Sequence, residues 1–366
     1  MIKVAYDSQI FAQQEFGGIS RYFCELANCV GRTPGFDSRV VAPLHRNRYL
    51  VDTATLDRGT FFNPAGRIAG KAMRVINDLV SPMLFRGYAP DILHETYYQE
   101  RDGSGLKCAR VITVFDMINE RLGEESPDRE NLRRAKLASI ARADSVICIS
   151  EYTRRDLIDL FGIPESKTRV VHLGFTLTAA TAADGGAGVD RPFILYVGKR
   201  DGYKNFDALL AAFAASARLR AQFALVAFGG GRFSDAENRR IAGLGLGAGD
   251  VIQVGGQDDR LGALYRAARC FIYPSMYEGF GIPPLEAMSF GCPVVSSNTS
   301  SIPEVVGDAA IMVDPGDIEA LRDAVERAAL DEEARRNLVT RGADRIRRFS
   351  WSNCAEETMK IYRGLL

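Results

Sequence analysis

The segment CFIYPSMYEGFGIPPLEAMSFGCPVVSS, residues 270–297, decides the fold class of this sequence. It predicts an apolar strand, a tight loop, a helix and a second apolar strand. Gly279 and Gly281 allow positive φ angles and a close approach of the backbone to a ligand. Pro283 and Pro284 suit the first turn of a helix, where a missing N–H group costs nothing. A strand–loop–helix–strand unit of this kind is typical of a parallel α/β sheet.

The same alternation of short apolar strands and helical patterns runs through the rest of the chain. The strand-length runs are rich in Val and Ile, and most of them end in a polar or glycine-containing turn, as in a parallel sheet covered on both faces. The first set is IKVAYD, SRVVAP, DILHE, ARVITVFD, SVICIS and RVVHLG, and the second is PFILYVGK, FALVAFGG, DVIQVGG, CFIYPS, CPVVSS and AAIMVD. The sequence therefore predicts an α/β protein with two Rossmann-like domains.

A segment between the two sets, TLTAATAADGGAGVD, has almost no large apolar residue and is typical of a linker. The closing segment FSWSNCAEETMKIYRGLL predicts a helix, with Ser352 as its N-cap and Trp351 as an apolar anchor before it. Open α/β sheets bind ligands beyond the carboxyl ends of their strands, so we expect the ligand site in a cleft between the two domains. The predicted parts are an N-terminal domain over 1–175, a linker over 176–190, a C-terminal domain over 191–350 and a helix over 351–366.

Composition narrows the function class. A chain of 366 residues suits two domains, and its 46 Lys and Arg residues balance 46 Asp and Glu residues. No overall positive field therefore favours nucleic acid. The seven cysteines show no metal-ligand spacing and predict reduced thiols and no zinc site. The opening MIKVAYDSQIF predicts a strand and no signal peptide, and no apolar run is long enough to cross a membrane. We expect a cytoplasmic protein.

Two glutamates flank the glycine-rich loop, Glu278 on its strand side and Glu286 on the first helical turn, with seven residues between them. The N–H groups at a helix N-terminus bind anions, and carboxylates accept hydrogen bonds from hydroxyl groups. Together they suit a ligand with phosphates and several hydroxyls, such as a nucleotide sugar. For Glu286 alone, a favourable interaction with the helix dipole explains the residue equally well.

A cationic cluster follows the first strand of the second domain. The segment KRDGYKN places Lys199, Arg200 and Lys204 at the carboxyl end of that strand. Cations at this edge of an α/β sheet are placed to hold a diphosphate. A solvated basic loop is the alternative, but the helix N-terminus in the same domain favours the phosphate site.

The motifs resemble those of the retaining glycosyltransferases of family 4, which adopt the GT-B fold. The resemblance is carried by YVGKRDGYKN, by LYRAARCFIYPSMYEGFGIPPLEAMSFGCPVVSSNTSSIPEVVGDAAIMVDPGD and by the terminal FSW. It extends through most of the chain and is strongest over residues 193–318. The fold that it implies has two Rossmann-like domains facing across a cleft, with the C-terminal helix returning to the N-terminal domain.

The resemblance also implies roles for single residues. Glu278 would contact hydroxyls of the donor sugar, and Glu286 would contact the ribose hydroxyls of the nucleotide. Arg200 and Lys204 would hold the phosphates, with Lys199 as a helper. The remaining donor-binding positions of this domain would be Gly198 and the backbone N–H groups of Gly279, Phe280, Gly281 and Ile282. No metal ion or other cofactor is implied, and no DxD-type motif stands out.

Residues of the N-terminal domain extend this site. Gly17 and Gly18 precede an amphipathic helix, and by the resemblance their loop closes over the diphosphate or approaches the acceptor. Many family members carry a His-Asp pair after the strand that matches VITVFD, whereas this chain has Phe115 and Asp116. The histidine contact with the donor sugar therefore cannot be carried over. Asp116 is expected to orient hydroxyls and counts with Glu278, Arg200 and Lys204 among the predicted catalytic residues.

Three further side chains are candidates for contact with acceptor or sugar. Phe115 stacks on a sugar or belongs to the core, and His94 in DILHE ends a strand at the cleft or is a core histidine. Ser150 is predicted to cap the helix of residues 152–160, with a ligand contact as a second role.

A basic amphipathic helix is predicted near residues 65–80. Ile68, Val75, Ile76 and Leu79 share one face, and the charged residues Arg67, Lys71, Arg74 and Asp78 lie on the other. Such a helix can lie on an anionic membrane, which predicts peripheral contact at the inner face of the cytoplasmic membrane. The more frequent arrangement, which we favour here, has the apolar face covering a sheet.

The predicted activity is transfer of a hexose, with retention, from a nucleotide-diphosphate sugar to a glycan or lipid-linked acceptor. The segments YVGKRDGYKN and TVFDMI resemble relatives that build bacterial surface polysaccharide such as O-antigen, often from GDP-mannose or related GDP-sugars. One alternative is a sugar-nucleotide-binding relative without catalysis. A second is a dinucleotide-dependent oxidoreductase, although YDSQIFAQQEFGG lacks the expected GxGxxG.

Overall fold

A computed structural model describes most of the chain. The described residues are 1–51, 55, 59–63, 67–102, 104–123, 126–176, 187–200 and 202–366, with only the backbone of 67–69. They form two compact units, one of Met1–Gly174 with Ser350–Leu366 and one of Phe175–Phe349. Most of the predicted linker, residues 177–186, lies outside the described residues.

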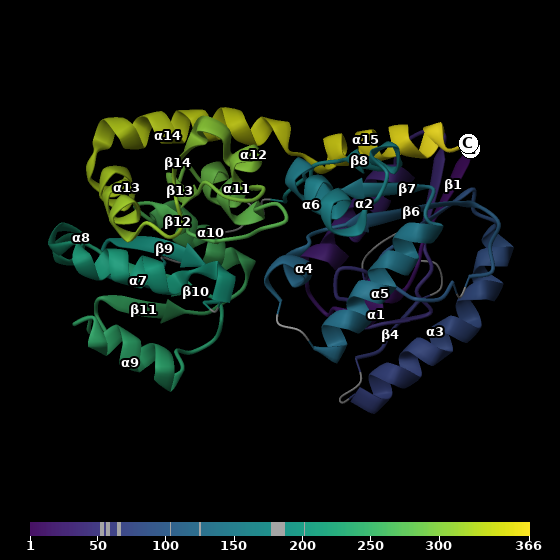
Figure 1. Cartoon of the computed structure of the whole chain (residues 1–366), viewed down its shortest axis with the longest axis horizontal. Helices are drawn as coiled ribbons and strands as arrows, with labels where there is room; N and C mark the ends of the chain where they lie inside the picture. Colours follow the sequence, from purple (N-terminus) through teal and green to yellow (C-terminus); the bar gives the residue numbers. More distant parts are fainter. Residues whose placement is uncertain are drawn as a thin grey trace. The chain divides into compact units, whose positions relative to one another are not determined.

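The first unit is built on a parallel sheet with helices on both of its faces (Figure 1). Its strand order is β2 (Phe36–Val40), β1 (Ile2–Tyr6), β5 (Ile92–Glu95), β6 (Ala109–Val114), β7 (Ser145–Cys148) and β8 (Thr168–Val170). A small second sheet pairs β3 (Leu44–His45) with β4 (Thr60–Phe61). The helices of this unit are α1 (Gln9–Gln13), α2 (Gly18–Gly31), α3 (Arg67–Tyr88), α4 (Ile118–Leu122), α5 (Pro127–Arg142), α6 (Glu151–Phe161) and α15 (Trp351–Gly364).

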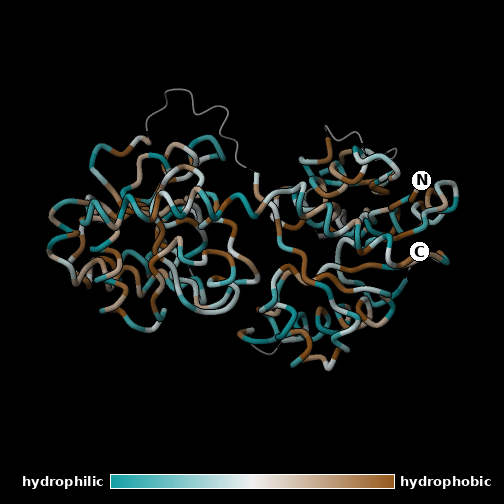
Figure 2. Tube along the Cα trace, turned by 90° about the horizontal axis from the view of Figure 1, so that it is seen from above, coloured by the Kyte–Doolittle hydropathy of each residue, from teal (hydrophilic) through white to brown (hydrophobic). Residues whose placement is uncertain are grey.

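The second unit repeats this architecture around its own parallel sheet. Its strand order is β11 (Val251–Val254), β10 (Ala224–Phe228), β9 (Phe193–Val197), β12 (Phe271–Tyr273), β13 (Val294–Ser297) and β14 (Ala310–Val313). The helices are α7 (Phe206–Ala215), α8 (Ala217–Gln222), α9 (Asp235–Gly243), α10 (Asp258–Ala267), α11 (Ile282–Ser289), α12 (Ile302–Val306), α13 (Ile318–Leu330) and α14 (Glu332–Arg345). Hydrophobic stretches run through the interior of each unit, as Figure 2 shows.

The strand orders locate the ligand-binding edge of each sheet. In the first unit the chain order reverses between β1 and β5, and in the second it reverses between β9 and β12. Open α/β sheets bind ligands at such switch points, beyond the carboxyl ends of the strands. The segments that leave β9 and β12 are KRDGYKN and the loop of Glu278, which carry the predicted donor residues.

The C-terminal helix belongs to the first unit, as the resemblance implied. Helix α15 packs on α2, and the Tyr362 hydroxyl lies 3.2 Å from the Tyr6 hydroxyl of β1. The predicted N-cap Ser352 is wrong, because the helix begins at Trp351, two residues before the position that this cap implies. Ser350 is the cap, and its hydroxyl accepts a hydrogen bond from the Asn353 N–H group.

His94 lies in the core of the first unit, so its predicted contact with a ligand is wrong. The ring is fully buried; Nδ1 lies 2.6 Å from the Tyr362 hydroxyl and Nε2 lies 2.8 Å from the Thr113 hydroxyl. Burial lowers the pKa of His94 to about 3. Both nitrogens are therefore occupied, and the ring remains neutral at physiological pH.

This burial predicts a pH dependence of stability. The unfolded chain protonates His94 near pH 6.5, whereas the folded protein does so near pH 3. Falling pH therefore favours the unfolded state by about 1.4 kcal/mol per pH unit below about pH 6. Urea unfolding from pH 7 to pH 4 should show that wild type loses stability relative to His94→Gln, which does not titrate in this range. A constant difference between the two proteins would contradict the assignment.

Helix α3 buries a face that the sequence pattern did not predict. Met73, Asn77, Phe85 and Tyr88 are buried, and the Asn77 side chain bonds both the N–H and the C=O group of Leu44. Val75, Ile76 and Leu79, which were expected to cover a sheet, are 57%, 43% and 71% exposed instead, so the favoured interpretation is wrong for them. The side chain of Ile68, the fourth residue of that face, lies outside the described residues. Val80 and Met83 are exposed as well, at 36% and 70%.

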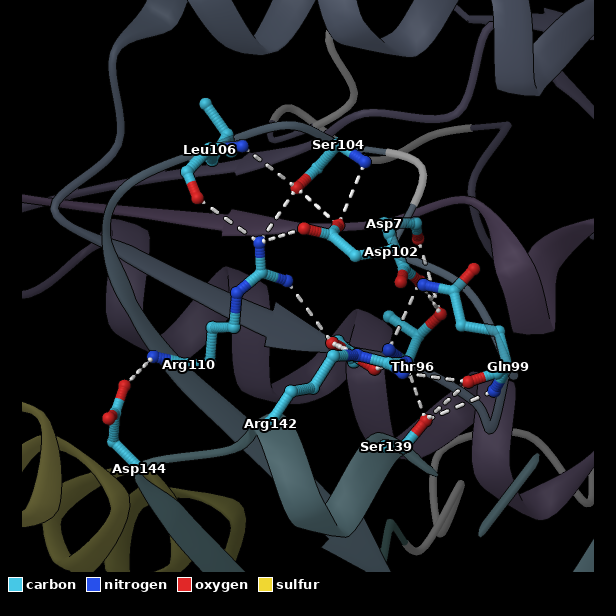
Figure 3. A network of polar contacts seen from close by, with 11 residues as sticks. Asp7, Thr96, Gln99, Asp102, Ser104, Leu106, Arg110, Ser139, Arg142 and Asp144 are labelled. Carbon is cyan, nitrogen blue, oxygen red and sulfur yellow. Dashed lines mark hydrogen bonds and ion pairs between the residues drawn. The ribbon is translucent and has the colours of Figure 1, made fainter. Parts of the chain in front are cut away.

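A buried ionic network fixes the ligand-side loops of the first unit (Figure 3). The Glu95 carboxylate, at the end of β5, accepts two hydrogen bonds of 2.6 Å from Arg142 of α5 and one of 3.3 Å from Arg110 of β6. Asp7, directly after β1, accepts hydrogen bonds from the N–H and hydroxyl groups of Thr96. The network thus joins both sides of the switch point between β1 and β5 to a helix behind them.

Candidate functional site

The centre of the candidate site is an ion pair at the switch point of the second unit. The Lys204 ammonium, in the segment after β9, lies 2.7 Å from Oε1 of Glu278, in the loop after β12. The two side chains are only 21% and 10% exposed. Burial and a hydrogen bond with Glu278 raise the pKa of Tyr273 well above its ordinary value. The structure therefore brings together two predicted catalytic residues with a tyrosine that the sequence did not single out.

Unusual backbone conformations lie on both sides of this pair. Only three non-glycine residues of the described chain have positive φ, and two of them, Asn205 at 58° and Ser300 at 54°, flank the pair. The Asn205 amide donates to the carbonyl groups of Pro274 and Pro315, at 3.1 and 2.8 Å. The Ser300 hydroxyl accepts from the Glu278 N–H group at 3.0 Å. Backbone strain of this kind persists where the surroundings enforce it, often at functional sites.

The loop between Glu278 and α11 is held by its carbonyl groups. The Ser301 hydroxyl lies 2.8 Å from the carbonyl oxygens of both Glu278 and Phe280. In a trans peptide the C=O and N–H groups point in opposite directions, so the N–H groups of Gly279 and Gly281 point away from Ser301. Gly281 has a φ of 118°, which requires glycine, and Ile282 begins the helix. The Phe280 ring is buried against Phe349, so only the backbone of this residue is placed as predicted, in the loop before α11.

Glu286 lies further along the helix than predicted. Helix α11 begins at Ile282, so Glu286 is its fifth residue and the first turn contains no acidic residue. Its carboxylate accepts a hydrogen bond of 3.3 Å from the Tyr265 hydroxyl. Burial, followed by the charge of Glu286, raises the pKa of Tyr265 well above its ordinary value. The helix-dipole explanation is therefore weaker, and Tyr265 helps to fix the position of the Glu286 carboxylate.

The three cationic side chains of KRDGYKN, Lys199, Arg200 and Lys204, do not converge on one site. Arg200 turns away from the Lys204–Glu278 pair and donates to Glu237 and to carbonyl groups of residues 229–232. Lys199 is exposed and its carbonyl group accepts from the Tyr196 hydroxyl. Gly198 has a φ of 140° and donates its N–H group to Phe228. Of the predicted phosphate ligands, only Lys204 lies beside the glutamate.

Some of the site residues predicted in the first unit lie in a loop or at the start of a helix, and others lie in the core. Helix α2 begins at Gly18 and not after it, with Gly17 preceding the helix. Phe115 is 8% exposed and packs edge-on against Tyr22 and Phe23, so the predicted sugar stacking gives way to the core alternative. Ser150 caps α6 and accepts from the Thr153 N–H group at 3.0 Å, which confirms its predicted capping role.

Asp116 remains a candidate after β6, half-buried at the ligand-binding edge of the sheet. Its carboxylate accepts from the Ile118 N–H group at 3.1 Å, and its carbonyl group accepts from the buried ammonium of Lys136 at 3.1 Å. Lys136 also pairs with Glu120 at 2.9 Å. The buried Lys136–Glu120 ion pair, which the sequence did not predict, therefore fixes the backbone at Asp116.

The residues that sequence reasoning missed share one property: they act through tertiary contacts. Their letters occur in ordinary helices, strands and turns, and no spacing distinguishes them. The one exception is Asn205, because asparagine tolerates a positive φ angle better than most residues and its place after Lys204 is compatible with a tight turn. The missed residues are Tyr273, Asn205, Ser300 and Ser301 around the pair, Tyr265 beside Glu286, and Lys136 and Glu120 in the first unit.

The fold and these motifs define a family. Residues 180–345 match the profile described as "Glycosyl transferases group 1", and residues 16–178 match "Glycosyltransferase Family 4". The chain is 31% identical over 272 residues to O-antigen chain mannosyltransferase B of Escherichia coli, with 71% of each protein covered. It is 28% identical over 269 residues to serotype-specific mannosyltransferase WbdA of Escherichia coli, covering 69% of this chain and 33% of that protein. The chain thus spans about a third of the second relative.

A solved structure has the same fold. The complex of Anabaena Alr3699/HepE with UDP and glucose aligns with a TM-score of 0.74 at 18% identity, covering 100% of both chains. The protein described here therefore belongs to the glycosyltransferases of family 4 and has their GT-B fold. It is a glycosyltransferase, and the oxidoreductase alternative is excluded.

Proposed function

We propose that this glycosyltransferase moves a hexose, which we infer to be mannose, from a GDP-sugar to a glycan or lipid-linked acceptor, with retention of configuration, in bacterial surface polysaccharide synthesis. The observation that carries the proposal is the Lys204–Glu278 pair at the switch point between β9 and β12. Mannose is supported by the names of the two Escherichia coli relatives. UDP in the Anabaena protein belongs to a neighbour of 18% identity and does not bear on the base.

The proposed reaction needs no protein nucleophile and no metal ion. The bond between the anomeric carbon and the diphosphate oxygen breaks, and the diphosphate leaves with the electron pair. The acceptor hydroxyl attacks from the same face, and its proton passes to a phosphate oxygen. Lys204 would balance the charge that develops on the leaving group, with backbone N–H groups near the start of α11 as further donors. Glu278 would accept hydrogen bonds from sugar hydroxyls.

A nucleotide screen tests the donor class. Thermal unfolding is measured with GDP, UDP, ADP, dTDP and NAD, and then with the matching nucleotide sugars, for wild type and Glu286→Ala. We expect GDP and one GDP-sugar to raise the melting temperature of wild type, with a smaller rise in the variant. If a different nucleoside diphosphate stabilises wild type, the donor carries the base of that nucleotide and not guanine. A rise with NAD alone would contradict the proposed function.

Sugar transfer separates the proposed enzyme from a binding protein of the same fold. A non-catalytic relative would bind the nucleotide sugar through Glu278 and Glu286 and release no nucleoside diphosphate in the presence of acceptor. This second candidate function, binding without transfer, is considered because Phe115 stands where many family members have a histidine.

We also propose that the exposed face of α3 binds an anionic membrane surface, where a lipid-linked acceptor would lie. Val75, Ile76, Leu79, Val80 and Met83 follow the i, i+1, i+4, i+5, i+8 spacing of one helical stripe, and we call them the α3 stripe. The exposed cations of this helix are Lys71 and Arg86, near the two ends of the stripe, and Arg74 on the opposite face, against one exposed acid, Asp78. An apolar stripe with basic flanks lies in the headgroup region of anionic bilayers. None of the described helices is long and apolar enough to cross a membrane.

Vesicle flotation tests the α3 stripe. Wild type should float with phosphatidylcholine vesicles that contain phosphatidylglycerol, and less so in high salt. Leu79→Glu/Met83→Glu should weaken this binding by at least about tenfold, because two large apolar side chains no longer enter the bilayer. Ile318→Glu, an exposed apolar position of the second unit, is the matched control and should float like wild type. Equal flotation of wild type and the double variant would contradict the proposal, and a dimer that only wild type forms would identify a second copy as the occupant.

A further inference from the structure

The guanidinium of Arg200, at the ligand edge of the second unit, donates five hydrogen bonds. Its side chain is only 4% exposed, and Nε donates to Oε1 of Glu237 at 2.6 Å. The terminal nitrogens donate to the carbonyl groups of four successive residues after β10, at 2.6, 3.3, 3.1 and 3.3 Å for Gly229, Gly230, Gly231 and Arg232. A group that is bonded on this many sides is ill placed to leave for a phosphate.

The acidic partner of Arg200 is itself fixed. Glu237 is the N3 residue of α9 and forms a capping box with Ser234, accepting from the Ser234 N–H group at 2.7 Å. On another side, the Phe233 ring lies 4.8 Å from the guanidinium carbon. Arg200 therefore joins the end of β9, the loop after β10 and the first turn of α9 into one unit.

The carbonyl bonds determine where the N–H groups of this loop point. Gly229, Gly230 and Gly231 all have positive φ, at 90°, 67° and 73°. Because the C=O and N–H groups of a trans peptide are opposed, a carbonyl group directed at Arg200 sends the next N–H group away from it. The N–H groups of Gly230, Gly231 and Arg232 thus point away from the guanidinium, and no acceptor for them lies within the described part of the chain.

A cavity of about 830 Å³ lies beside this loop, within the second unit. Its lining includes Lys199, Gly230, Arg200 itself and the first turn of α9 with Glu237, at the carboxyl ends of β9 and β10. Nucleotide ligands of open α/β sheets bind at this edge. The loop that Arg200 shapes therefore borders a cavity at the ligand edge of the sheet, and the segment that carries Lys204 borders the same cavity through Gly202.

We infer that Arg200 is a positioning residue of the donor site, which binds the donor indirectly by holding the glycine loop, residues 229–232, in a shape that directs its N–H groups to oxygen atoms of the nucleotide. This inference rests on the proposed function for its ligand. It replaces the direct phosphate contact predicted for Arg200 from the sequence. The charge of Arg200 is then less important than the geometry of its planar fork of donors, which lysine does not reproduce.

The test compares Arg200→Lys with Arg200→Gln. First, amide hydrogen exchange of residues 228–234 is measured without ligand, where both variants should exchange at least about tenfold faster than wild type because the carbonyl bonds are lost. Second, calorimetry gives the Kd of the nucleoside monophosphate and diphosphate. Both variants should bind each ligand about tenfold more weakly, and lysine should rescue neither, because the loop and not the charge is changed. Circular dichroism and the melting temperature report whether the variants fold.

A matched pair of glycine substitutions tests the loop while Arg200 itself is kept. A Cβ at Gly230 would lie 2.5 Å from the Arg200 guanidinium, whereas one at Gly231 meets nothing within 4 Å, and both residues have positive φ. Gly230→Ala should therefore reproduce the exchange and binding changes of Arg200→Lys, and Gly231→Ala should show the smaller effect of backbone strain alone.

Two results would overturn the inference. Normal exchange and normal binding in Arg200→Lys would remove the positioning role. A loss of affinity that lysine rescues and that grows from monophosphate to diphosphate would identify Arg200 as a direct phosphate ligand. If no nucleotide binds wild type, the proposed function fails, whereas the exchange experiment still decides whether Arg200 holds the loop.

Discussion

Lys204→Met is expected to lower kcat/KM for sugar transfer by about 10²–10³-fold, the range measured when one preorganised donor to a developing negative charge is removed. The ammonium of Lys204 lies 2.7 Å from Glu278, in surroundings where both side chains are largely shielded from water. Its removal takes away the cation that would face the departing diphosphate. It also leaves the Glu278 carboxylate uncompensated beside the bound anion, so donor affinity should fall with kcat.

The matched control is Lys360→Met on α15, an exposed lysine that pairs with Glu356 and Glu357 and lies in the other unit. It should retain wild-type rates. Steady-state kinetics with a saturating acceptor measure both variants, and circular dichroism establishes that they fold. A Lys204→Met enzyme with more than about a tenth of the wild-type kcat/KM would show that Lys204 is not the main charge-balancing group.

Glu95→Gln is expected to destabilise the first unit by about 3 kcal/mol, since removal of one partner from a buried ionic network leaves charges uncompensated. Glu95 is 1% exposed and is shared by Arg110 and Arg142 (Figure 3). Arg110 keeps Asp102 as a partner at 2.6 Å, so most of the loss should come from Arg142.

Urea unfolding followed by circular dichroism measures this change. The matched control is Glu357→Gln, in a pair whose side chains are 54% and 55% exposed, which should change stability by less than about 0.5 kcal/mol. Equal midpoints for the two variants would contradict a structural role for the network and would weaken the view that it fixes the ligand-side loops.

The sequence predicted the parts of this protein that depend on local pattern. Short apolar runs between helical segments determine a parallel sheet, because both faces of such strands are covered, and the two sets of runs led to two Rossmann-like domains. The glycines and prolines of YEGFGIPPLE predicted the turn before α11, because few residues tolerate the φ of 118° at Gly281 or begin a helix without an N–H group.

The structure departs from the sequence expectations where a side chain has a choice of distant partners. Arg200 was expected to hold a phosphate because it follows a strand, whereas in the structure it donates to Glu237 and to the carbonyl groups of residues 229–232. His94 has the same strand-end position, yet α15, more than 250 residues later, supplies Tyr362 and closes it into the core. No local spacing encodes either contact.

Helix α3 shows a related limit. Its periodicity gives two apolar faces, and the pattern alone does not decide which of them packs. The bonds of Asn77 to Leu44 fix the rotation of the helix and leave Leu79 and Met83 exposed. A buried polar residue on the packed face thus determined the surface that the apolar pattern assigned wrongly.

The most direct test of the central claim is the stereochemistry of transfer. The enzyme is incubated with an α-linked nucleotide sugar, first GDP-mannose, and a mannoside acceptor in the presence of EDTA, and the anomeric proton of the product is observed by NMR. We expect an α-linked product, formed without metal and about 10²–10³-fold more slowly by Lys204→Met. A β-linked product would contradict retention, and the absence of transfer from any nucleotide sugar, with binding preserved, would identify a binding protein in place of an enzyme.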